Sequence, residues 1–128
     1  MKDPHNLLDP EDLLHFVELD NFVDEWKACK LDVEADLGEL MIGIMANPKA
    51  APVIKGTGGL RKLRYSPRKM SIGKRGAFRV CYVYFEEHWT IMLVTVYKKG
   101  RSDDLDADDK KAIRTIIAEI EKYLDERS

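Results

Sequence analysis

The chain has 128 residues, 45% of them hydrophobic, and a formal net charge of -2. This length suits one domain with a modest core and excludes two. No apolar run is long enough to cross a bilayer and the start lacks the apolar centre of a signal peptide, so we expect a cytoplasmic protein. Cys29 and Cys81 show no metal-ligand spacing, so we expect reduced thiols, with a disulfide as the lesser alternative.

The chain opens on an acidic stretch. Residues 1–13 combine prolines with acidic residues, a composition that suits a solvated N-terminal extension better than a packed element. The remainder, residues 14–128, is expected to form a single domain. Within it, residues 14–19 are a candidate first strand, although Leu13 and Leu14 could equally begin a helix.

Two helices are expected after this strand. Asp20 or Asn21 could cap the first of them, which carries Trp26 on its apolar side. Residues 32–46 predict the clearer helix, because their apolar side chains recur at spacings of three and four and Pro48 follows. The apolar stripe of this helix is expected to be core.

Three strands are predicted in the middle of the chain. Residues 60–65 and 78–85 alternate with a period of two, and residues 89–97 are rich in β-branched side chains. The glycines within residues 56–59 indicate a turn with positive φ, because no Gly-Lys-Ser/Thr sequence follows that would make a phosphate-binding loop. Residues 66–76 are polar and basic and are expected to form a loop.

The turn between the last two strands decides which side chains share a face. If residues 86–88 form a tight turn, Arg79 lies near Val96 and, diagonally, Lys98. His88 is then expected to be a solvated turn residue with no part in catalysis.

The chain ends in a predicted helix. Residues 106–109 resemble a helix start, because their acidic side chains suit the positive end of the helix dipole. The apolar stripe that follows, which includes Ile113 and Ile117, is expected to pack on the sheet face opposite the basic one, or on a partner. The predicted class is α+β, an antiparallel sheet with two N-terminal helices and a C-terminal helix.

Positive charge is concentrated in one part of the chain. Residues 49–101 contain 13 Lys and Arg and 2 acidic residues, a net of +11, which leaves 8 basic and 21 acidic residues, or -13, elsewhere. A surface this basic attracts polyanions, and counterion release favours phosphate backbones as partners.

At these residues the sequence resembles the HigB and RelE toxins of bacterial toxin-antitoxin modules, and most closely the HigB-type branch. The matching pieces are Asn47-Pro48, residues 53–64, residues 73–76, Arg79-Val80 with Tyr82, and Tyr97 with Lys99. The resemblance runs from about Leu14 to the last helix. It implies a RelE-like fold and a small endoribonuclease that cleaves messenger RNA at the ribosome, inhibits translation and is held inactive by an antitoxin.

The reaction that this resemblance implies is attack of a ribose 2′-hydroxyl on the adjacent phosphate, which leaves a cyclic phosphate and a free 5′-hydroxyl. It needs a base, an acid and positive charge on the phosphate oxygens. A lysine crowded by other cations could act as the base, and the choice between Lys62, Lys98 and Lys99 stays open. Arginine stays protonated, so Arg79 is expected to bind phosphate. No cofactor or metal is expected, because no cluster of carboxylates or of Cys and His accompanies the basic residues.

The candidate site residues fall into two sets. The expected catalytic set is Lys62, Arg64, Arg79, Tyr97, Lys98 and Lys99. The expected RNA-binding set is Arg61, Arg68, Lys69, Lys74, Arg75 and Arg101. The sequence departs from some relatives at Leu105, where they carry a tyrosine. The expected partners are a cognate antitoxin, messenger RNA and the A site of the small ribosomal subunit, without a membrane.

Two other functions remain open for the same scaffold. One is a non-enzymatic inhibitor of DNA gyrase, as in the ParE relatives, which lack the basic catalytic set. The other is an RNA-binding module without nuclease activity, whose binding would weaken steeply with salt.

Overall fold

The structure is a computed structural model that describes residues 14–68, 77–100 and 105–127. Its elements in chain order are β1 (His15–Glu18), α1 (Phe22–Ala28), α2 (Ala35–Ala46), β2 (Leu60–Tyr65), β3 (Phe78–Phe85), the 3-10 turn η3 (Glu86–His88), β4 (Thr90–Lys98) and α3 (Ala107–Arg127). The predicted α+β class is confirmed. β2 and β3 have the bounds that their alternation predicted, and the N-terminal extension lies outside the described residues.

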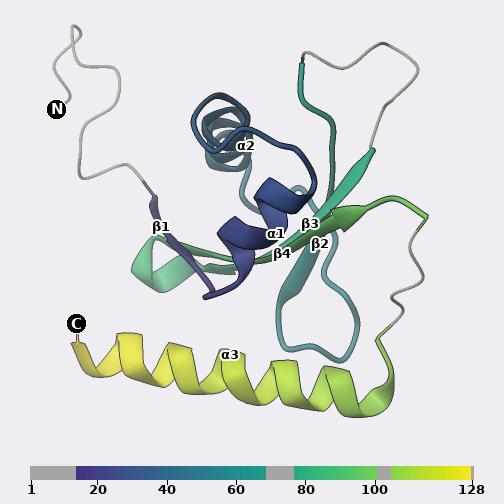
Figure 1. Cartoon of the computed structure of the whole chain (residues 1–128). Helices are drawn as coiled ribbons and strands as arrows, with labels where there is room; N and C mark the ends of the chain where they lie inside the picture. Colours follow the sequence, from purple (N-terminus) through teal and green to yellow (C-terminus); the bar gives the residue numbers. More distant parts are fainter. Residues whose placement is uncertain (1–13, 69–76, 101–104, 128) are drawn as a thin grey trace, which may run out of the picture.

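One four-stranded sheet organises these elements, in the order β1-β4-β3-β2. β3 pairs antiparallel with both β2 and β4, whereas β1 pairs parallel with β4, so the sheet is mixed. Figure 1 shows α1 and α2 on one side of the sheet and α3 along the other. The sheet is therefore covered on both faces. None of the described helices is long and apolar enough to cross a membrane.

The first core lies between the sheet and the two N-terminal helices. Phe22 and Trp26 are four residues apart in α1, so they share one face of that helix and both are fully buried. The Trp26 ring stacks on Phe22 and on Tyr65 of β2, with centroids 5.8 and 5.7 Å apart. Its indole N–H donates to the Asp32 carbonyl at 2.9 Å, which satisfies the one polar atom of the side chain.

Tyr65 links this core to α2. Its hydroxyl donates to the Asp36 carbonyl at 2.9 Å, and the side chain is buried. Burial is the main cause that raises the pKa of Tyr65 above its ordinary value of 10.0, and the negative charges of Glu39 and Asp36 raise it further.

The raised pKa predicts a loss of stability at alkaline pH. Below pH 10 the phenol is protonated in both states, and above it the unfolded chain releases a proton that folded Tyr65 retains, so the free energy of unfolding falls as pH rises. Urea unfolding from pH 8 to 11 should show this fall, and Tyr65→Phe should make it shallower while costing about 1 kcal/mol at pH 8 for the lost hydrogen bond. Tyr123→Phe, at a residue that is 55% exposed, is the control and should keep the wild-type slope.

The second core lies between the opposite sheet face and α3. Ile117 is buried there against Leu60, Cys81 and Val83, with Ile113 packed beside it. Side chains alternate along a strand, so the face of Leu60 is also the face of Lys62 and Arg64. The prediction that the last helix covers the face opposite the basic one was therefore wrong.

The reason for this error is that β3 is buried on both sides. Val80 and Tyr82 belong to the first core and Cys81 and Val83 to the second. A strand that is apolar on both faces does not indicate which face a given helix covers.

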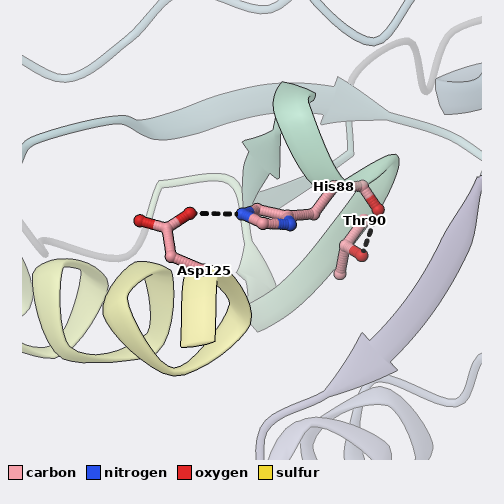
Figure 2. Close-up of polar contacts among 3 residues, drawn as sticks. All are labelled: His88, Thr90 and Asp125. Atoms are coloured by element: carbon pink, nitrogen blue, oxygen red, sulfur yellow. Dashed lines mark hydrogen bonds and ion pairs between the residues drawn. The ribbon is translucent and has the colours of Figure 1, made fainter. Parts of the chain in front are cut away.

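The C-terminal half of α3 is fixed by the turn between β3 and β4. His88 Nε2 lies 2.6 Å from Asp125 Oδ1, and the Thr90 hydroxyl donates to the His88 carbonyl at 2.9 Å (Figure 2). The His88 side chain is only 13% exposed, so the expectation of a solvated turn residue was wrong. His88 instead joins the sheet to the last helix.

Candidate active site

A bulge between β3 and β4 sets which side chains meet at the basic end of the sheet. Cys81 pairs with Thr95 while Tyr82 pairs with Leu93, so Val94 is an additional residue in β4. Beyond the bulge Arg79 lies opposite Tyr97, and the predicted neighbours of Arg79 were wrong. Lys98 pairs with Phe78, which places it on the opposite face from Arg79.

Three side chains form a line across the strands that we call the basic row: Arg64 of β2, Arg79 of β3 and Tyr97 of β4. Arg64 pairs with Arg79, and Arg79 pairs with Tyr97. Directly opposed residues have Cβ atoms about 4.5–5.5 Å apart, and like charges at that spacing destabilise a sheet. Arg79 Nη1 donates to the Phe78 carbonyl at 3.3 Å. Both arginines line the same hollow at the edge of the sheet, where a bound anion would offset the repulsion between their charges.

Lys62 lies on the same face of the sheet as the basic row, two residues before Arg64 in β2. It pairs with Cys81, which in turn pairs with Thr95, and it is half-buried. Two hollows meet at this side chain. The first, which we call the edge pocket, has a volume of about 450 Å³ and is lined by residues 50–52 together with Lys62, Leu63, Arg64 and Arg79.

The second hollow, which we call the helix pocket, lies between the sheet and the start of α3. Its volume is about 360 Å³. Its lining is Glu25, Ile54, Leu60, Lys62, Cys81, Val94, Thr95, Tyr97, Leu105, Lys110 and Ile113. Tyr97 of the basic row and the neighbouring Lys62 thus line a space that α3 borders.

The glycine loop before β2 holds α3 in this position. Gly56, Gly58 and Gly59 have φ of 86°, 78° and 133°, which confirms the predicted turn with positive φ. The Arg114 guanidinium donates to the Gly56 carbonyl at 2.9 Å, and a Cβ on Gly58 would lie 3.2 Å from Arg114 Cγ. Figure 1 shows this loop reaching from β2 to α3. The loop can approach α3 this closely because glycine has no Cβ at Gly58.

Thr57 makes the same loop rigid. Its side chain is fully buried, and its hydroxyl donates to the Ile54 carbonyl at 2.7 Å while accepting from the Leu60 N–H at 3.0 Å. Because both bonds lie immediately before β2, the loop and the strand that carries Lys62 form one unit.

The start of α3 is fixed by a reciprocal cap. The Asp109 N–H donates to Asp106 Oδ1 at 2.8 Å, and the Asp106 N–H donates to Asp109 Oδ2 at 3.3 Å. This cap confirms the predicted acidic helix start and brings Lys110 to the helix pocket in the first turn. Lys110 and Arg114 were not among the residues predicted from the sequence. Their spacing of four residues, which places them on one side of the helix, is the signal that could have indicated them.

The other predicted site residues lie apart from the basic row. Arg61 is on the opposite face, where its Nη1 donates to the carbonyls of Lys49 at 3.0 Å and Ala51 at 2.7 Å. Lys99 follows the end of β4, is exposed, and donates its backbone N–H to the Ala77 carbonyl at 2.8 Å. Arg68 is exposed, and its backbone N–H donates to a Glu39 carboxylate oxygen at 3.2 Å.

Four members of the RNA-binding set, and most of the predicted loop at residues 66–76, lie outside the described residues. These four are Lys69, Lys74, Arg75 and Arg101. The RNA-binding roles stay predictions. In the part of the chain that the structure describes, no group of three His, Cys, Asp or Glu side chains is arranged to hold a metal ion.

No family model matches the sequence. Among solved structures, a mutant of the E. coli toxin RelE in the free state superposes with a TM-score of 0.50, at 15% identity, over 82% of this chain and 97% of that one. This chain has the RelE fold. The isolated E. coli RelE toxin matches with a TM-score of 0.48 and 19% identity, over 80% of this chain and 98% of that chain.

A chain of the intact E. coli RelBE toxin-antitoxin complex matches with a TM-score of 0.48 and 18% identity, over 69% of this chain and 99% of that chain. The predicted RelE-like fold is confirmed, and the HigB branch stays a prediction. Within this RelE fold, the basic row and Lys62 occupy the sheet face that α3 partly covers.

Proposed function

We propose that this chain is the toxin of a toxin-antitoxin pair, an endoribonuclease that cleaves messenger RNA on the ribosome and thereby inhibits translation. One observation carries the proposal: Lys62, Arg64, Arg79 and Tyr97 come together on one sheet face, beside two hollows that Lys62 lines in common. The RelE fold is consistent with it. An unrelated structural use of this face would not require two arginines directly opposite each other.

The reaction is attack of a ribose 2′-hydroxyl on the adjacent phosphorus, which breaks the bond to the 5′ oxygen of the next nucleotide. The base takes the 2′-hydroxyl proton, and the leaving 5′ oxygen takes up one proton to become a hydroxyl. Negative charge accumulates on the phosphate oxygens in the transition state. Arg64 and Arg79 bind these oxygens, because guanidinium groups stay protonated and present several donors in one plane. The cations supply the charge, so the proposal calls for no metal ion or cofactor.

Lys62 is the best placed base among the lysines of the predicted catalytic set. It is half-buried on the face of the basic row and borders both hollows. Lys98 lies on the other face, and Lys99 is exposed beyond the end of β4. We therefore assign proton transfer to Lys62, base stacking to Tyr97 and RNA backbone contact to Lys99. A ring beside a phosphate site stacks on a nucleobase without regard to sequence.

The partner in this proposal is an antitoxin that covers the basic row. An acidic segment would complement Arg64, Arg79 and Lys62 and would exclude messenger RNA from the same face. The proposal places the active toxin at the A site of the small ribosomal subunit, where a single-stranded codon is available.

The experiment is to induce the chain in cells and to map the 5′ ends of messages by primer extension. We expect new breaks inside translated codons, with 5′-hydroxyl and 2′,3′-cyclic phosphate ends on products made with purified ribosomes. DNA damage without breaks in messages would instead indicate a gyrase inhibitor. Salt-sensitive RNA binding without any cleavage would indicate an RNA-binding module.

A further inference from the structure

We propose that the helix pocket is a nucleotide-binding subsite, in which the apolar lining holds the base next to the scissile bond and Lys110 binds the phosphate of that nucleotide. This inference rests on the proposed function and adds a residue of α3 to the substrate contacts. It concerns a space that the basic row borders but does not fill.

The lining of the pocket suits a ligand with an apolar ring and a charged group. Leu60, Val94 and Ile113 supply apolar walls, while Lys62 and Lys110 supply two cations, against one carboxylate in the lining, that of Glu25. The volume of about 360 Å³ is near the lower end of the range of about 300–1,000 Å³ for small-molecule sites. A single nucleotide therefore suits the pocket better than a longer segment of RNA.

Lys110 is held by its surroundings. The reciprocal cap of Asp106 and Asp109 fixes the first turn of α3, and the Lys110 side chain passes Gly56, where a Cβ would lie 3.4 Å from Lys110 Cδ. The residue is half-buried, and within residues 14–68, 77–100 and 105–127 no carboxylate forms an ion pair with it. Its ammonium group is thus placed for an anionic ligand.

The two hollows indicate why this ligand belongs to the same RNA chain. Lys62 lines both the edge pocket, which contains Arg64 and Arg79, and the helix pocket, which contains Lys110. An RNA strand with its scissile phosphate at the basic row would place a neighbouring nucleotide past Lys62. The helix pocket is the space that receives it.

The test compares Lys110→Gln with Lys111→Gln, because Lys111 is the next residue of α3, is exposed and does not line the pocket. The probe is a short RNA whose reacting 2′-hydroxyl is replaced by hydrogen, which cannot be cleaved, titrated at several salt concentrations. Lys110→Gln should weaken binding roughly tenfold, as expected for one lost charge-assisted contact. It should also reduce the slope of log K against log salt by about 0.7, the value for one phosphate of a single strand. Lys111→Gln should change neither quantity.

A second variant tests the apolar part of the subsite. Val94→Phe should fill the pocket and weaken RNA binding by roughly tenfold, with no change in the salt slope because no cation is removed. As a control for folding, the midpoint temperature of thermal unfolding of Val94→Phe should equal that of wild type. Inorganic phosphate serves as the competing probe: if it displaces the RNA from wild type and Lys110→Gln equally well, Lys110 does not bind phosphate and the assignment is overturned.

Parallel cleavage assays with an all-ribose message separate the two proposals. If wild type cleaves the message while Lys110→Gln binds RNA as tightly as Lys111→Gln, the subsite is overturned and the proposed function stands. If wild type binds RNA but never cleaves it, the proposed function is overturned, and the same pair of variants still decides the subsite.

Discussion

Replacing Arg79 with alanine should lower the rate of messenger RNA cleavage by at least about 10²-fold, because the loss of one preorganised donor to transition-state charge typically costs 10²–10³ in kcat. Arg79 lies at the centre of the basic row, between Arg64 and Tyr97. The measurement is the single-turnover rate on ribosomes programmed with one message, at saturating toxin. Growth arrest after induction should disappear with the same variant.

The matched control is Arg127→Ala, which removes an exposed arginine from the last residue of α3, where it stacks on Tyr123. That variant should cleave at the wild-type rate. Arg79→Ala should unfold within about 1 kcal/mol of wild type, because relief of the like-charge pairing with Arg64 offsets the loss of the hydrogen bond to the Phe78 carbonyl. Cleavage by Arg79→Ala at the rate of Arg127→Ala would remove Arg79 from the active site.

Replacing Lys62 with arginine should lower kcat by roughly 10²–10⁴, which is the usual contribution of a positioned general acid or base. Arginine keeps the positive charge of Lys62 but does not release its proton, so this substitution separates proton transfer from electrostatic stabilisation. KM should change far less than kcat, because the variant leaves in place Arg64 and Arg79, the residues proposed to bind the phosphate.

Two further measurements complete this test. Lys111→Arg, at an exposed lysine of α3, should keep the wild-type kcat. Lys62→Ala should recover part of its activity when a small primary amine is added, since the neutral amine can accept the proton of the 2′-hydroxyl, whereas guanidinium should not restore it. Wild-type kcat in Lys62→Arg would mean that Lys62 acts only through its charge.

The strands could be predicted from the sequence, but their register could not. The alternation of apolar and basic residues sets the bounds of β2 and β3, because a period of two is specific to strands. The bulge at Val94 cannot be recognised in the sequence, because the residues around it are also β-branched or apolar and no change in their pattern marks the extra residue. One extra residue there moved the partner of Arg79 from Val96 to Tyr97, and with it the composition of the basic row.

The separation of neighbouring cations also required the structure. Arg61 and Lys62 are adjacent in a basic run, yet Arg61 anchors the chain at Lys49 and Ala51 while Lys62 borders both pockets. From composition, both residues belong to a basic segment predicted to bind phosphate. The structure shows that their side chains point to opposite faces of β2, and that Arg61 binds backbone carbonyls of its own chain. Lys110 was missed because its role depends on where α3 lies, and the position of α3 depends on packing between distant elements.

Because β1 pairs with β4, the sheet cannot be completed during synthesis until its last strand has been made. β1 leaves the ribosome early, but the strand that it pairs with is the last of the sheet to be made. Contacts so distant along the chain form late, and domains complete their folding only when all their elements have emerged. Because Tyr97 lies on that last strand, the basic row is complete only after β4 has been made, so under the proposed function a nascent chain would not yet cut the message from which it is being translated.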